Sequence, residues 1–146
     1  MSWRGVIIHH SAGHADKPLW KLDQEHRGRG FSEVGYHFYI PADGTVWLGR
    51  STLLVGAHCH AGGRNRTHLG ICLAGDFETH EPTKAQMDTL LNVVVEQIAR
   101  YWFSSADIQG HTEVPGARTA CPGIRLLERL PWLRRQADLL LPWCML

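Results

Sequence analysis

The segment from Thr83 to Tyr101 constrains the fold most, because its apolar residues recur with the 3.6-residue period of a helix that has one apolar face. Thr83 is a residue type that caps helix N-termini, so the helix is expected to start just after it. Such a helix must cover an apolar surface of another element. The periodic positions are Met87, Leu90, Leu91, Val94, Val95, Ile98 and Tyr101.

The surface that this helix covers is predicted to be a β-sheet. Short apolar or alternating runs predict strands at residues 6–9, 36–40, 45–48, 69–73 and 107–109, and Pro41 to Gly44 predicts a hairpin turn. Further helices are expected at residues 18–26 and 124–141. The 146 residues, 44% hydrophobic and 20% charged, fit one domain spanning residues 1–146. We therefore expect an α/β fold with a central mixed sheet and helices packed on its faces.

Charge and hydropathy exclude several classes of partner. The formal net charge is +1 and there is no Lys/Arg cluster, which disfavours nucleic acid. No stretch has the length of a membrane span, so stable membrane insertion is not expected. Residues 1–5 cannot supply the apolar core of a secretory signal, which predicts synthesis in the cytoplasm.

The cysteines are irregularly spaced, as expected for a protein of a reducing compartment. Cys72 lies in a predicted strand and is expected to be a small core residue. The roles of Cys59 and Cys144 stay open. The chain has no CxxC pair, the usual spacing of a structural zinc site.

Three residues far apart in the sequence are candidate zinc ligands. His9 ends the first apolar run, His111 follows the short strand at 107–109, and Cys121 lies in a loop rich in proline and glycine. Two imidazoles and a thiolate occupy three corners of a zinc tetrahedron and leave the fourth for water, as in catalytic sites. His10 is expected to point to the opposite face of the strand from His9. The other histidines His14, His26, His60 and His80 are expected to be solvated or in loops.

The chain resembles a known family in six motifs that occur in the family's order. These are residues 7–12 (IIHHSA), 34–38 (VGYHF), 43–46 (DGTV), 56–58 (GAH), 69–77 (LGICLAGDF) and the stretch from Gly110-His111 to Cys121-Pro122-Gly123. The family is that of the zinc-dependent N-acetylmuramoyl-L-alanine amidases, which includes phage lysozymes of the amidase type and catalytic peptidoglycan recognition proteins. The resemblance implies Zn²⁺ as cofactor, with His9, His111 and Cys121 as its ligands.

The resemblance also implies catalytic roles for Tyr36 and Thr119. Tyr36 matches the family's catalytic tyrosine, whose phenol can hydrogen-bond the attacking water or the oxyanion. Thr119 stands where some phage members carry lysine and recognition proteins often carry threonine. A hydroxyl donates a hydrogen bond but brings no positive charge, so Arg118 is an alternative oxyanion donor. Glu113 is an alternative for proton transfer, or else a solvated carboxylate.

The implied substrate is the muramyl peptide of peptidoglycan. His37 and the loop residues His58, Arg64 and Asn65 are expected to contact it, although a polar surface loop is the alternative for the last three. His37 follows Tyr36 and is expected to face the other side of the strand. No acidic pair of the kind that glycoside hydrolysis needs stands out near the proposed site.

The predicted function is hydrolysis of the amide bond between N-acetylmuramic acid and L-alanine. We expect a monomeric phage or prophage endolysin, made in the cytoplasm and acting on the cell wall after a separate protein permeabilises the membrane. The alternatives are an amidase of soluble muropeptides in cell-wall recycling and a non-catalytic peptidoglycan-binding module. Some phage lysozymes of this family also bind an RNA polymerase, but nothing in this sequence marks such a surface.

Overall fold

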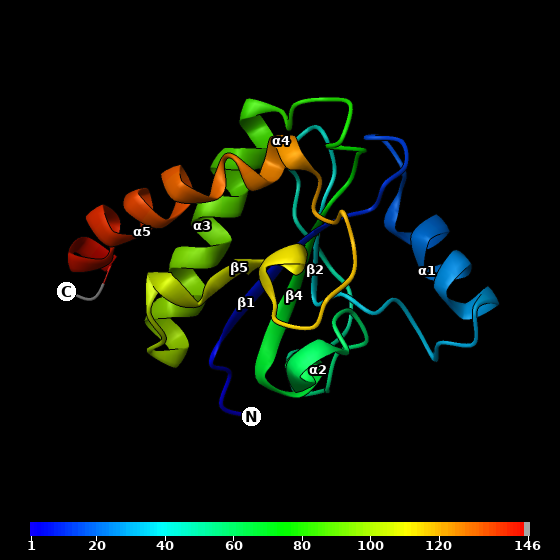
Figure 1. Ribbon diagram of the computed structural model, residues 1–146, viewed down its shortest axis with the longest axis horizontal. Coiled ribbons are helices and arrows are strands. Elements are labelled where there is room, and N and C mark those ends of the chain that lie inside the picture. The colour runs from blue at the N-terminus through cyan, green and yellow to red at the C-terminus, as the bar shows by residue number, and fades with distance from the viewer. Residues whose placement is uncertain (145–146) are drawn as a thin grey trace.

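The sheet at the centre of the molecule is mixed, as predicted. The computed structural model describes residues 1–144, without the side chains of Trp143 and Cys144, so the role of Cys144 lies outside the described part (Figure 1). The strand order is β3-β2-β4-β1-β5, with only β3 antiparallel to its neighbour. The strands are β1 (Gly5–His10), β2 (Phe38–Ile40), β3 (Trp47–Leu48), β4 (His68–Leu73) and β5 (Ile108–Gly110).

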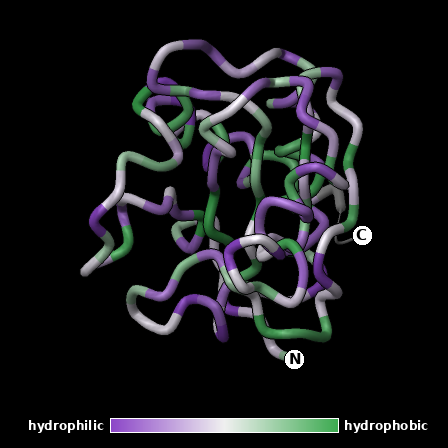
Figure 2. Tube along the Cα trace, turned by 90° about the vertical axis from the view of Figure 1, so that its right-hand side faces the viewer, coloured by the Kyte–Doolittle hydropathy of each residue, from purple (hydrophilic) through white to green (hydrophobic). Residues whose placement is uncertain are grey.

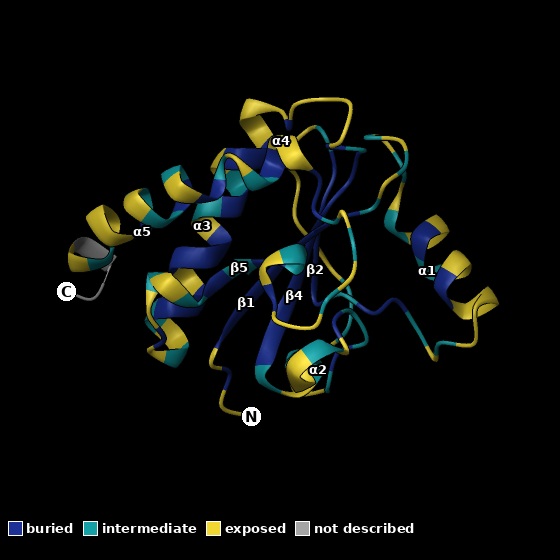
Figure 3. Cartoon of the chain, viewed as in Figure 1, coloured by how far each residue is buried: buried dark blue, intermediate teal, exposed yellow. Residues whose placement is uncertain are grey.

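The central strands β1 and β4 are buried along their whole length, which explains why their sequences are nearly continuous apolar runs (Figure 3). They pair in parallel from Gly5 opposite His68 to His10 opposite Leu73. β5 pairs with the other side of β1, with Ile8 opposite Gly110. The carboxyl ends of these strands therefore meet at one edge of the sheet.

Helices cover the two faces of the sheet unequally. The helix predicted first, α3 (Lys84–Tyr101), begins after a capping box formed by Thr83 and Gln86. It packs with α5 (Leu130–Cys144) over one face, where Val6, Ile8 and neighbouring apolar residues form the main core. The opposite face carries α1 (Leu19–Gly28) and a smaller core around Tyr39 and Cys72. That face is left partly open for a site.

The predicted C-terminal helix is wrong in one respect, because residues 124–141 do not form one continuous helix. A short helix α4 (Ile124–Leu127) ends before α5 begins at Leu130. Pro131 has no backbone N–H and cannot continue a helix through the preceding turn, but it fits the first turn of a new one. Prediction also missed the four-residue helix α2 (Arg64–Thr67), which is too short to show a period.

Hydrophilic residues lie mainly along the outer loops, and hydrophobic residues concentrate in the strands and in the helices that face them (Figure 2). Over the described residues, no helix combines the length and the hydropathy that a bilayer crossing requires.

Candidate metal centre and active site

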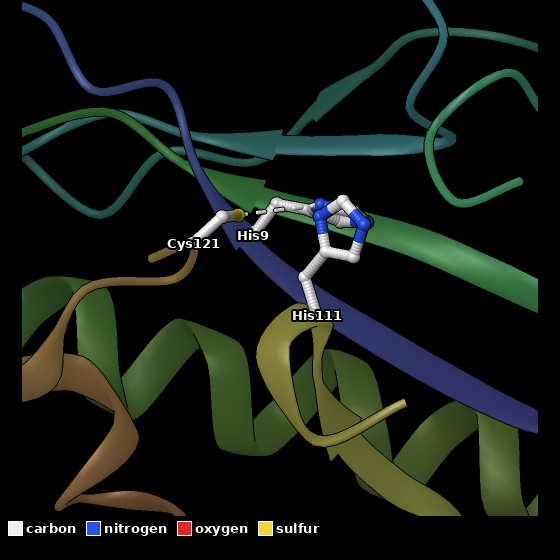
Figure 4. Close-up of side chains that lie close together, drawn as sticks. All are labelled: His9, His111 and Cys121. Atoms are coloured by element: carbon white, nitrogen blue, oxygen red, sulfur yellow. Dashed lines mark hydrogen bonds between the residues drawn. The ribbon is translucent and has the colours of Figure 1, made fainter. Parts of the chain in front are cut away.

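The three candidate ligands converge at the carboxyl edge of the sheet. His9 is near the end of β1, His111 comes directly after β5, and Cys121 lies on the loop before α4 (Figure 4). Their ligand atoms all lie within 4.8 Å of one another. The sequence prediction that these residues lie together is therefore confirmed.

The spacing of His9 and Cys121 fits a tetrahedral zinc ion. Cys121 Sγ and His9 Nδ1 are 3.5 Å apart. Zinc bonds of about 2.3 Å to sulfur and about 2.0–2.1 Å to nitrogen, at a tetrahedral angle, separate these two atoms by about 3.6 Å. Two imidazole nitrogens and one sulfur also match the ligands that zinc prefers over magnesium or calcium. The three residues can therefore hold this metal.

Burial sets the protonation of these groups. It lowers the pKa of His9 well below its usual value, and the nearby His58 and His111 lower it further. The imidazole is therefore neutral near pH 7, which is the form that binds metal. Burial also raises the pKa of the Cys121 thiol to about 12. A bound cation acts in the opposite direction, because coordination deprotonates a thiol.

A cavity of about 540 Å³ opens directly onto the cluster. Its walls contain the three candidate ligands together with Tyr36, Thr119, His10, Ala12 and two further segments of the chain, so His10 also reaches the cavity, against expectation. Those segments contribute His26, Arg29 and Phe31 from the end of α1 and its loop, and Ala57, His58, Cys59, His60 and Asn65 from the loop before β4. Another hollow of about 600 Å³ lies between α1 and the β2–β3 hairpin, but it contains no candidate ligand, so we place the chemistry in the smaller one.

Tyr36 lies beside the metal-ligand cluster. Its ring centroid is 5.0 Å from that of His9 and 5.4 Å from that of His26. Burial raises the pKa of the Tyr36 hydroxyl well above its usual value, and the Cys72 and Cys121 thiols add to this effect. The phenol therefore stays protonated at neutral pH and can donate a hydrogen bond into the cavity.

Thr119 and Arg118 differ in their relation to the cavity. Thr119 lines it, and its Oγ1 accepts a hydrogen bond from the backbone N–H of Cys121 at 3.1 Å. Its hydroxyl hydrogen is not used in that bond and can still be donated. Arg118 is not among the residues that line the cavity. Thr119 is therefore the better placed of these two residues.

Glu113 supports the turn that presents His111. Its Oε1 accepts a hydrogen bond from the Gly110 N–H at 2.8 Å and another from Arg134 Nη2 at 2.8 Å. The Arg134 guanidinium also donates to the carbonyl oxygen of Ile108. Glu113 is thus neither free in solvent nor one of the cavity-lining residues, and it ties the end of β5 to α5.

The expectation that His37 contacts the substrate is wrong. The side chain has no exposed surface, its Nδ1 accepts from the Gly70 N–H, and its Nε2 donates to the Leu54 carbonyl oxygen. It also faces away from Tyr36 and outside the cavity, as alternation along a strand requires. Arg64 likewise does not line the cavity, and its Nη1 donates to the Gly62 carbonyl oxygen.

His58 and Asn65 do line the cavity, but their polar atoms serve the protein itself. Asn65 Oδ1 accepts from the backbone N–H groups of His58 and Cys59, each at 2.7 Å. The His58 ring lies between His9 and the backbone of β4. Burial lowers the pKa of His58 to about 3, so this imidazole is neutral as well.

His26 is a functional-site residue that the sequence prediction missed, since it was expected to be solvated. It is buried on α1, where its Nδ1 accepts from the Gly35 N–H at 3.0 Å and its ring packs near Tyr36. The sequence did contain one indication that His26 is buried: it comes four residues after Leu22, the other buried position of that helix, and so lies on the same helix face. Arg29 and Phe31 were also missed, because nothing in a loop sequence shows which way it folds.

The fold and the site define an α/β domain with two histidines and a cysteine, able to hold a metal ion, at the carboxyl edge of a mostly parallel sheet. The comparisons with known proteins then place it more narrowly. The sequence pattern of the N-acetylmuramoyl-L-alanine amidase family matches residues 1–124. The chain belongs to this family.

Relatives and solved structures agree with this placement. The endolysin of Escherichia phage T7 is 38% identical over 128 residues, which are 83% of this chain and 81% of that protein. Peptidoglycan-recognition protein LB of Drosophila melanogaster is 33% identical over 135 residues, 86% of this chain and 56% of that protein. The structure of N-acetylmuramoyl-L-alanine amidase LysC from Clostridium intestinale matches with a TM-score of 0.84 and 30% identity, covering 94% of this chain and 87% of that one.

The contacts of Glu113 predict that the Glu113→Gln substitution changes stability slightly and catalysis little. An amide keeps the acceptor for Gly110 and loses only a partly exposed ion pair, worth about 0.2–1 kcal/mol. We expect kcat within roughly fivefold of the parental value. Amidase kinetics and thermal unfolding measure both effects, with Glu128→Gln, outside the cavity, as control. If Glu113 were the general acid, kcat would instead fall by about 10²-fold or more.

Proposed function

We propose that this protein hydrolyses the amide bond between N-acetylmuramic acid and L-alanine in peptidoglycan, that its activity requires zinc, and that it acts as a cell-wall-lytic endolysin. The observation that carries the proposal is the convergence of His9, His111 and Cys121 in a cavity that Tyr36 also lines, with its ring beside His9. Family membership adds the bond class. A complete ligand set next to a hydroxyl donor favours an enzyme over a non-catalytic binding module.

In the proposed mechanism His9, His111 and Cys121 would hold the metal ion at the cavity that they line. Bound there, zinc supplies a water of lowered pKa and polarises the scissile carbonyl. The protein positions the amide carbonyl over the three ligands and excludes bulk water from them. His9 is almost fully buried, so the substrate meets the ligand cluster only from the cavity side.

Tyr36 and Thr119 supply hydrogen bonds to the reacting atoms. Tyr36 remains a phenol because burial raises its pKa, so its O–H can donate to the carbonyl oxygen as negative charge develops there. Thr119 can donate from the Cys121 loop. Neither brings a positive charge. Arg29 is the cavity-lining side chain with a permanent positive charge, and it lies at the α1 end, where it can meet an anionic part of a stem peptide.

Relatives support peptidoglycan as the substrate. The T7 and T3 phage proteins are named endolysins. Drosophila PGRP-LB, 30% identical with a TM-score of 0.77, has been solved as a point mutant in complex with tracheal cytotoxin. We extend a muramyl-peptide substrate to this chain on that basis. The cavity is open to solvent, so a peptide strand can reach it.

The first test of this function identifies the bond that is cut. Digestion of purified peptidoglycan should release new N-terminal alanine and leave the glycan strands at full length, because the site has no acidic pair for glycoside hydrolysis. Labelling of amino termini and a reducing-sugar assay measure the two products. New reducing ends, or a new amino terminus other than alanine, would overturn the assignment.

A second test concerns the metal. Purified protein should contain about one zinc per chain, since the site has one set of three borderline-soft ligands. Cys121→Ser should bind zinc far more weakly, with His80→Gln, an exposed histidine outside the cavity, as control. Elemental analysis and chelator competition give the readout. Full activity of metal-free protein in the presence of chelator would contradict the proposal.

A third test separates the hydroxyl of Tyr36 from its ring. Tyr36→Phe should keep the fold and the zinc, because the ring still packs against His9 and His26. We expect kcat to fall by roughly 10²-fold, the usual effect of removing one donor to the oxyanion. Zinc content and thermal unfolding serve as controls on the same sample. A variant that turns over at the parental rate would make Tyr36 a structural residue.

A further inference from the structure

His58 connects the buried ligand His9 to the backbone of the sheet. His58 Nδ1 is 2.9 Å from His9 Nε2, and His58 Nε2 is 3.0 Å from the carbonyl oxygen of His68. The two imidazole rings stand nearly perpendicular, at 86°, with centroids 5.0 Å apart. The chain of contacts therefore runs from the β4 backbone through two rings to the metal-ligand cluster.

The carbonyl oxygen of His68 determines which ring nitrogen carries the hydrogen in His58 and, through His58, in His9. A carbonyl only accepts hydrogen bonds, so His58 Nε2 must carry the hydrogen. A neutral imidazole carries one ring hydrogen, so His58 Nδ1 is then bare and must accept from His9 Nε2–H. A neutral His9 that carries its hydrogen on Nε2 has a free lone pair on Nδ1. That nitrogen is the one 3.5 Å from Cys121 Sγ.

The local backbone is shaped to hold the His58 ring in this position. A Cβ atom added at Gly70 would lie 2.6 Å from His58 Cγ and Cδ2, and one added at Gly56 would lie 2.5 Å from Cδ2. Glycine is otherwise unfavourable within a strand such as β4, and it marks a close approach there. Asn65 holds the backbone of His58 through its side-chain oxygen. The ring thus occupies a slot between two glycines.

We propose that His58 is a positioning residue that fixes the tautomer and the ring orientation of His9, so that His9 presents Nδ1 to the metal. The inference rests on the proposed function, because it assumes that zinc binds at His9. It replaces the predicted role of His58 in substrate contact. Hydrogen-bond partners of metal-ligating histidines generally act in this way, and their loss costs about 10–100-fold in metal affinity or activity.

The tautomers can be read directly by long-range ¹H–¹⁵N NMR of the imidazole rings, which does not depend on turnover. In the metal-free and the zinc-loaded protein, His9 should carry its hydrogen on Nε2 and His58 on Nε2. Zinc should shift the Nδ1 resonance of His9 and leave both hydrogens in place. A hydrogen on Nδ1 of either ring in the metal-free protein would overturn the inference.

Substitutions at His58 should change zinc affinity in a graded order. The amide oxygen of His58→Asn can stand near the place of Nδ1 and accept from His9, whereas His58→Leu has no acceptor. We expect zinc affinity to fall about 10–100-fold in His58→Leu and by less in His58→Asn. Chelator competition gives the affinities, and circular dichroism of the metal-free proteins checks the fold. His80→Gln removes an exposed histidine outside the cavity and should bind as the parent does.

A second variant tests the same position without changing any histidine. Gly70→Ala should push the His58 ring out of its slot and weaken zinc binding in the same direction. If both His58→Leu and Gly70→Ala fold and bind zinc as tightly as the parent, the inference fails while the proposed function stands. If the parental protein binds no zinc, the proposed function fails and the inference fails with it.

Discussion

The parallel pairing of β1 with its two neighbours is the constraint on which the site depends. Ile8 lies opposite Gly110, so His9 and His111 come one position further along adjacent strands and project at the same edge. On its other side Ile7 lies opposite Gly70, the glycine that makes room for the His58 ring. A shift of register by one residue would turn the His9 side chain to the other face of the sheet, away from His111 and Cys121. The hydrogen-bond ladder thus sets the metal-ligand geometry before any metal binds.

Burial of polar groups at this edge is tolerated because each has a partner within the protein. His9, His37 and His58 all bond through their ring nitrogens, and burial keeps the pKa of each below its usual value. Neutral imidazoles lose less solvation on burial than charged ones. Burial therefore keeps the histidines neutral, which is the form that binds a metal ion. Burial also strengthens a hydrogen bond from Tyr36 to a charge that develops in the cavity.

Several polar side chains around the site bond to other parts of the protein and thereby hold the scaffold in place. Glu113 joins the His111 turn to Arg134 of α5. The side chain of Asn65 accepts hydrogen bonds from the backbone of the loop that carries His58. The C-terminal helix α5, which lies beyond the family match at residues 1–124, is therefore connected to the metal-ligand cluster through β5. Tyr36 and Thr119 are the two hydroxyl-bearing side chains that line the cavity.

The sequence alone determined the α/β class, the mixed sheet and α3 with its cap, because period and apolar runs are local properties of a chain. The order of the motifs along the chain determined that His9, His111 and Cys121 meet. It could not determine the break at Pro131, or which polar loop residues turn inward. His26, His37 and His58 show the reason: each is a histidine with the same intrinsic chemistry, and only its neighbours in space decide its role. Tertiary structure buried His26 behind Tyr36, bonded His37 into the sheet, and set His58 against the ligand His9.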